Sequence, residues 1–288
     1  MNPARWTVCL AALAALAAAG PATALDLHGF ADVRAGARLD DDPNQDRISL
    51  AELRLQLDWM GSYEHATFQV RSDFVADPVQ DDPWPTDLER GEGPVDLREA
   101  NALLYPASFA DLKVGRQILT WGTGDLLFIN DLFPKDWVSF FAGRDEEYLK
   151  APSDAAMLSL FPPWAAIDIV YTPRFDADRF ISGRRFSFWN DAAGGRTGEA
   201  MPVNADVPDD WFADDEIAIR VSRNVGSKEL ALYGYSGYWK SPAGSDPLTG
   251  KASFPGLRVA GASARGQLGP GILNVEGGWY DSDDDRDG

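Results

Sequence analysis

Cysteine, positive charge and long apolar runs are scarce in this sequence, and each scarcity narrows the class of protein. The single cysteine, Cys9, lies in the N-terminal apolar stretch, so the remaining chain offers no disulfide and no cysteine metal site. Lysine and arginine number 26 against 45 acidic residues. The net charge of −19 argues against nucleic acid as a partner, because phosphate binding requires clustered cations. After the N-terminal stretch, no segment reaches the ~18 apolar residues of a transmembrane helix.

The N-terminus has the three parts of a secretory signal peptide. Arg5 supplies positive charge, "VCLAALAALAAAG" (8–20) is a short apolar run, and Ala-Thr-Ala at 22–24 fits a cleavage site. We predict that residues 1–24 form a signal peptide cleaved after Ala24, with an uncleaved anchor as the alternative. An exported chain without a transmembrane helix is a secreted or periplasmic protein, or an outer-membrane barrel.

Alternation of apolar and polar residues dominates residues 25–288. In "LAELRLQLDW" (50–59), apolar residues fall at every second position, with Glu, Arg, Gln and Asp between them. Most strand-like segments have roughly 9–11 residues, the length with which a tilted strand crosses a bilayer. There are eleven such segments, at 27–39, 50–59, 66–74, 95–105, 110–120, 154–161, 165–172, 215–223, 229–239, 257–266 and 271–280.

The connections between these segments alternate between long and short. Long ones follow the odd-numbered segments, as in outer-membrane barrels with long outside loops and short periplasmic turns. The sequence therefore predicts an all-β fold, an antiparallel transmembrane β-barrel built as an up-and-down meander of about 11 strands. The alternative is a secreted β-sandwich, which would use the same alternation with its apolar face inside.

One segment conflicts with the lipid-facing pattern. In "DLKVGRQILTWG" (111–122), Arg116 shares the face of Leu112, Val114 and Ile118. A lipid-facing arginine at mid-bilayer costs about 2–4 kcal/mol. We therefore predict a β-bulge at Gly115 that slips the register and turns Arg116 inward, with local thinning of the barrel wall by a neighbouring element as the alternative.

The same region resembles a known family. "VGRQILTWGTGDLLFINDLFPKDW" (114–137) and "GRDEEYLKAPSDAAML" (143–158) are similar to a mostly uncharacterised family of Gram-negative outer-membrane porin-like β-barrels with a G-R-Q…W-G strand end, which in general plan is similar to alginate-export porins. The resemblance covers about 45 residues, 114–158. It implies a barrel fold and does not identify the transported solute.

The connection at 121–153 is amphipathic and long. It holds the apolar stretches "LLFI" and "WVSFF" together with many charges, so we expect it to fold into the lumen as a constriction or to cap the barrel. Inward-facing arginines of the strands would complete the pore lining. The pore-lining candidates are Arg34, Arg54, Arg71, Arg116, Asp125, Asp131, Asp136, Arg144, Glu146, Glu147 and Lys150.

No catalytic pattern accompanies these charges. The chain has two histidines, His28 and His65, and it lacks a Gly-x-Ser-x-Gly elbow, a His-Glu-x-x-His motif and a phosphate loop. The sequence therefore predicts no enzyme and no cofactor. It predicts a porin-like channel of the cell outer membrane, in contact with outer-membrane lipid and lipopolysaccharide, through which small polar solutes diffuse. A non-transport barrel for binding, adhesion or envelope structure is the alternative, and the oligomeric state stays open.

The acidic end "DSDDDRDG" (281–288) resembles half of an EF-hand loop. Asp283, Asp285 and Asp287 alternate before Gly288, but no closing Glu follows and no flanking helices are predicted. We interpret these residues as the start of an outside loop, with divalent-cation binding as a weak hypothesis. Single-chain bacterial barrels have even strand numbers, so eleven strands suggest a C-terminally truncated chain with an open edge at the eleventh strand, or a strained closure against the first.

Overall fold

The computed structural model describes residues 26–79, 85–124, 126–191, 194–198, 201–246 and 248–283. The predicted signal peptide at 1–24 lies outside these ranges. The chain is all-β. Its helical elements within these ranges are the short α2 (Trp137–Phe141) and the 3₁₀ turn η1 (Glu146–Leu149).

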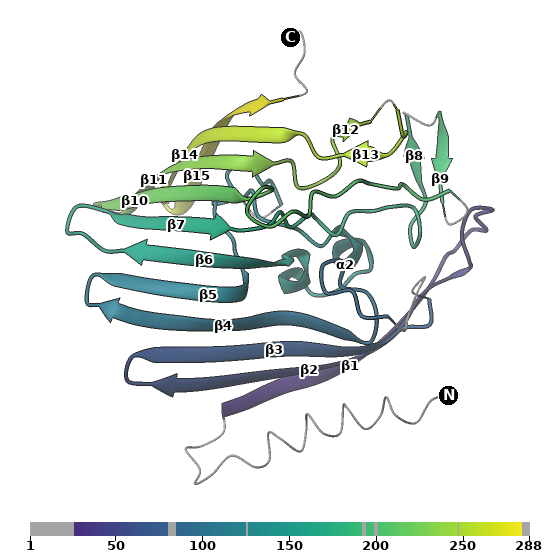
Figure 1. The fold of residues 1–288 in the computed structure, drawn as a ribbon, viewed down its shortest axis with the longest axis horizontal. Coiled ribbons are helices and arrows are strands. Elements are labelled where there is room, and N and C mark those ends of the chain that lie inside the picture. The colour runs from purple at the N-terminus through teal and green to yellow at the C-terminus, as the bar shows by residue number, and fades with distance from the viewer. Residues whose placement is uncertain are drawn as a thin grey trace.

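The dominant element is an eleven-stranded antiparallel sheet whose strands follow one another in chain order (Figure 1). All eleven predicted segments form it. The strands are β1 (Asp26–Ala37), β2 (Ile48–Tyr63), β3 (Ala66–Ala76), β4 (Val95–Ala107), β5 (Ala110–Ile118), β6 (Pro152–Leu160), β7 (Ala166–Thr172), β10 (Glu216–Val225), β11 (Lys228–Tyr238), β14 (Gly256–Leu268) and β15 (Gly271–Ser282).

Short turns and long connections lie at opposite ends of this sheet, as the sequence predicted. The turns between β2 and β3, β4 and β5, and β10 and β11 each have two residues between the strand ends. Two long connections carry small hairpins of their own, β8 (Phe188–Asn190) with β9 (Gly195–Thr197) and β12 (Gly244–Ser245) with β13 (Ala252–Ser253).

The two faces of the sheet have the reverse polarity of a soluble protein. On β2, Glu52 and Arg54 are buried, with 1% and 4% of their surface exposed, whereas Leu53 and Leu55 are 52% and 43% exposed. A sandwich with an apolar core would bury the leucines and expose the charges. On this strand the polar face is the inside of the molecule.

The sheet curls around the connection between β5 and β6, which we call the inner loop (residues 119–151; Figure 1). Arg34 on β1 donates to the Gly143 carbonyl at 2.6 Å, and Thr123 donates to Glu276 on β15 at 2.8 Å. The loop thus reaches both edge strands, and its Phe133 is buried against β6, β7, β10, β11 and β14.

The two edge strands do not pair with each other. Within the described ranges β1 pairs with β2 alone and β15 with β14 alone, so the sheet keeps the predicted open edge at the eleventh strand. The eleven strands therefore do not close into the predicted barrel.

The predicted bulge at Gly115 is wrong, although Arg116 does turn inward. The pairing of β5 with β4 and β6 runs through Gly115 without a register shift. Instead Gly115 has φ +117°, a backbone conformation that favours glycine, and it redirects Arg116 into the interior, where 6% of that residue is exposed. The bulge lies on β4, where the pairing with β3 shifts beside Arg71 and Ser72.

Candidate functional site

A buried ion pair fixes the inner loop to β2, and a second ion pair joins β2 to β3 beside it. Glu52 accepts from Arg54 Nε at 2.8 Å and from Arg144 Nε at 3.1 Å. Arg54 also pairs with Asp73, which is fully buried. Buried charges are tolerated only when paired, because each ion loses its hydration. The position of the inner loop therefore depends on the charged side chains of β2 and β3.

Tyr148 is the second anchor of the inner loop. Its hydroxyl donates to Asp73 at 2.7 Å and accepts from Gln56 Nε2 at 2.9 Å. The guanidinium carbons of Arg54 and Arg98 lie 4.7 Å from the ring centroid. Burial of the ring, together with the charge of Asp73, raises the pKa of Tyr148. The tyrosine therefore stays neutral and can keep donating.

Arg179 connects the inner loop to the β7–β10 connection. Its Nη2 and Nη1 lie 2.7 and 2.9 Å from the two oxygens of Asp96 on β4, and Nη1 lies 3.1 Å from Asp136. Its backbone N–H donates to the Lys135 carbonyl at 2.8 Å. Asp136 in turn caps α2 by accepting from the Ser139 N–H at 2.6 Å. One guanidinium thus joins a strand, a helix start and a long connection.

The other end of the inner loop is held by weaker polar contacts. Asn130 donates to the Ala262 carbonyl at 3.3 Å, and Tyr280 donates to the Ile129 carbonyl. Lys135 lies 3.0 Å from Asp131, and burial lowers the pKa of Lys135. The loop therefore has many charged contacts toward β1–β4 and mostly backbone contacts toward β14 and β15.

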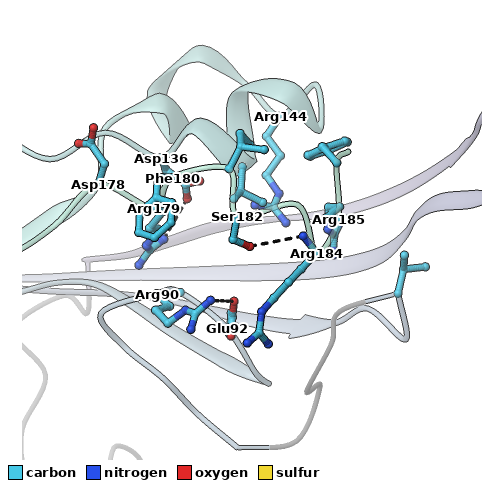
Figure 2. A pocket seen from close by; sticks show the side chains of 15 residues that line it. Arg90, Glu92, Asp136, Arg144, Asp178, Arg179, Phe180, Ser182, Arg184 and Arg185 are labelled. Carbon is cyan, nitrogen blue, oxygen red and sulfur yellow. Dashed lines mark hydrogen bonds and ion pairs between the residues drawn. The ribbon is translucent and has the colours of Figure 1, made fainter. Parts of the chain in front are cut away.

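A cavity of about 780 Å³, including its part open to solvent, lies where three connections meet (Figure 2). Arg144 and Arg179 in its wall are engaged by Glu52 and by Asp96 and Asp136. We call it the arginine cavity, because its wall contains Arg90, Arg144, Arg179, Arg184 and Arg185.

Carboxylates offset much of the positive charge of the arginine cavity. Arg185 pairs with Asp77, and Arg90 lies 3.4 Å from Glu92. Figure 2 shows Arg90 and Glu92 on one side of the cavity and the segment from Asp178 to Arg185 on the other. The space is therefore a polar cavity lined by mixed charge.

The structure brings together many of the predicted pore-lining residues. Arg54, Asp136 and Arg144 belong to the network around Glu52 and Arg179. The others lie as follows: Arg34 pairs with Asp32 and Asp145, Arg71 with Asp58 and Glu99, Arg116 with Asp154, and Asp131 with Lys135.

The remaining predicted residues contribute no side-chain contact to the buried network in the described part of the chain. Glu146 and Glu147 are exposed at the start of η1, and Lys150 contributes its backbone carbonyl to Arg98 at 2.8 Å. Asp125 is outside the described residues. Asp283 is exposed after β15, and Asp285 and Asp287 are likewise outside the described residues.

Tyr148, Arg98 and Arg179 are residues of the network that are absent from the predicted pore lining. Tyr148 lies within "EEYLK" in an irregular connection, where neither strand alternation nor the neighbouring charges indicate a buried ring. Arg98 and Arg179 are fully or almost fully buried, yet Arg98 lies beside the β4 bulge and Arg179 in an irregular connection, so strand alternation gave no signal for either.

No metal centre is evident in the part of the chain that the structure describes. There, no group of three or more His, Cys, Asp or Glu residues is placed to hold an ion. Across the same ranges, no helix is both long and apolar enough to cross a membrane.

Comparison with known proteins leaves the chain without an assigned family. No protein-family model matches it, and no curated protein matches it.

Proposed function

We propose that this chain is an outer-membrane β-barrel protein of porin type, through which small polar solutes diffuse. The observation that carries the proposal is the reversed polarity of the sheet, with charged side chains buried around the inner loop and leucines outside. Such a sheet suits a solvent that is apolar, because the outward leucines are then no longer exposed to water.

The outward apolar surface supports a bilayer setting. Exposed large apolar side chains recur along β1, β2, β3, β10, β11 and β15, including Val33 at 76%, Leu232 at 63% and Ile272 at 70% exposed. Burying one such side chain is worth roughly 1.5–3 kcal/mol, so the whole band favours transfer out of water strongly. Most strands of the sheet have 9 or more residues, as a tilted membrane-crossing strand requires.

The inner loop would act as the constriction of the pore. Charged side chains in a narrow passage select solutes by charge and by hydrogen bonding. Arg34, Arg71 and the arginine cavity lie along the inside of the curled sheet, each with carboxylates nearby. Mixed charge of this kind suits passage of polar solutes without tight binding. Outer-membrane lipid and lipopolysaccharide are the partners that this proposal implies.

A second function is favoured by the density of the interior network. Glu52, Arg54, Asp73 and Tyr148 satisfy one another, as structural groups do. A barrel whose interior is filled in this way would suit binding or envelope structure without transport.

Conductance separates these two functions. The full chain, refolded into planar bilayers, is expected to give discrete conductance steps. The double variant Arg144→Gln/Tyr148→Phe, which loosens the inner loop, is expected to raise the step size. Arg223→Gln, an exposed change on β10, is the matched control and should leave the steps unchanged. Absence of steps from protein that has inserted and folded would favour the non-transport barrel.

A further inference from the structure

The short-turn end of the sheet contains a notch where β10 and β11 project past β7. β7 pairs with β10 only as far as Ser222, whereas β11 pairs with β10 as far as Val225. A hollow of about 770 Å³, including its part open to solvent, lies between the projecting strand and the β6–β7 connection. We call it the rim notch, and its wall contains Phe161, Trp164, Ser222, Arg223 and Asn224.

Arg223 is the cation of the rim notch, and it lacks a counter-charge. Its side chain is exposed and forms no ion pair with any residue that the structure describes. Glu229, the carboxylate in the same wall, is already engaged by Arg220 at 2.7 Å. Lys228, in the turn that follows β10, is exposed and likewise unpaired within the described ranges. Two neighbouring cations are therefore available to an external anion, although acidic residues outnumber basic ones in the chain.

Arg223 lies on the side of the sheet that carries the outward apolar surface. Side chains alternate along β10, so Arg223 shares a face with Ile217 and Ile219, which are 50% and 40% exposed. Its cross-strand partner on β11 is Leu230, and Leu232 follows on the same face at 63% exposed. The guanidinium therefore marks the level at which the apolar surface ends, next to the short turns.

Trp164 adds an amphipathic ring at the same level. It is 58% exposed, and its indole N–H has no acceptor among the described residues. Phe161, in the same wall, is 47% exposed. Tryptophan favours the boundary between hydrocarbon and headgroups, because its ring is apolar and its N–H is polar. A ligand that carries both a phosphate and hydrocarbon chains would satisfy the guanidinium, the indole and the apolar strand face together.

We propose that the rim notch binds the headgroup of an anionic phospholipid, with Arg223 donating to the phosphate and the acyl chains lying on the outward face of β10 and β11. Guanidinium groups suit phosphate, because their N–H donors form paired, charge-assisted hydrogen bonds with its oxygens. Short turns of outer-membrane barrels face the periplasm, so this lipid belongs to the periplasmic leaflet. The inference rests on the proposed membrane setting and adds to it one class of lipid and one place on the sheet.

Native mass spectrometry of the full chain, refolded in detergent micelles and titrated with dioleoyl phosphatidylglycerol, tests this site. We expect the lipid to bind, and Arg223→Gln should weaken its binding about five- to ten-fold. Arg258→Gln is the matched control, because Arg258 is exposed on β14, between the buried Leu257 and Val259, at the end of the sheet with the long connections. It should leave the affinity unchanged.

Further probes distinguish the lipid from other sources of phosphate. Glycerol 3-phosphate, which lacks acyl chains, should not displace the lipid at equal concentration, and dioleoyl phosphatidylcholine, which has no net charge, should bind several-fold more weakly. Trp164→Leu should weaken phosphatidylglycerol binding several-fold, because it removes the indole N–H. It also provides a second test if Arg223→Gln does not fold.

Several results would overturn the proposal. They are no binding of phosphatidylglycerol, equal losses in Arg223→Gln and Arg258→Gln, unchanged affinity in Arg223→Gln or Trp164→Leu, equal binding of phosphatidylcholine, and displacement by glycerol 3-phosphate. Conductance is recorded separately, and Arg223→Gln is expected to leave its steps unchanged. Loss of the lipid site and failure of the channel are therefore distinguishable.

Discussion

Arg179 joins segments that are distant in sequence, so a single side chain holds several parts of the fold together. Its guanidinium contacts Asp96 on β4, Asp136 at the start of α2 and the carbonyls of residues 88 and 89. The sequence predicted that Asp136 and Arg144 lie inside, because their loop is amphipathic. It could not identify Arg179, because the partners of an arginine in an irregular connection are set by how three segments meet.

The first prediction removes this guanidinium. Arg179→Gln leaves Asp96 and Asp136 buried without a cation, so the free energy of unfolding should fall by about 3–5 kcal/mol. Arg223→Gln, on the exposed part of β10, should change it by less than about 0.5 kcal/mol. Urea unfolding in detergent micelles, followed by tryptophan fluorescence, measures both. Equal effects of the two changes would show that Arg179 is not a structural centre.

Strands are the elements that the sequence predicted most completely. All eleven alternating segments form strands of one sheet, because a period of two places every second side chain on the same face. The local geometry at Gly115 was predicted incorrectly. Burial of Arg116 could be anticipated from the cost of a lipid-facing arginine, but a bulge and a positive φ both achieve that burial. Only the backbone of β5 shows which one is used.

The second prediction tests that backbone. In Gly115→Ala, the added Cβ would lie 2.4 Å from the Ala100 carbonyl oxygen, at a φ that alanine rarely adopts. The free energy of unfolding should fall by about 2–3 kcal/mol. Gly277→Ala on β15, where a Cβ meets nothing within 4 Å, is the matched control. A tolerated Gly115→Ala would mean that this backbone conformation is not required.

At the scale of the whole molecule, the sheet has a polar face turned inward and an apolar face turned outward. The outward face determines whether water or lipid is the favourable surroundings. Leu55 is 43% exposed, whereas the neighbouring Arg54 and Gln56 face the buried network. The sequence contained this alternation but left open which face points inward, since a sandwich and a barrel share it. Contacts of the inner loop with both edge strands identify the polar face as the inside.

The third prediction tests the membrane setting of the outer face. Leu55→Arg places a charge on the apolar face, and in phospholipid bilayers it should lower the free energy of unfolding by about 2–4 kcal/mol. Leu39→Arg makes the same change in the β1–β2 connection, where Leu39 is 99% exposed, and should have little effect. If Leu55→Arg is as well tolerated as Leu39→Arg, the outer face does not contact lipid.

The sequence by itself determined the strands, their order and the alternation of long and short connections. These properties depend on local periodicity and on turn residues close in the chain. The tertiary structure alone decided which face is inside, how Gly115 turns Arg116 inward, and which charges pair. Arg179 with Asp96, Arg144 with Glu52 and Tyr148 with Asp73 join positions 75–92 residues apart. Such pairs form only when the inner loop and the β7–β10 connection fold against the curled sheet, because a buried charge is stable only beside the partner that this folding brings to it.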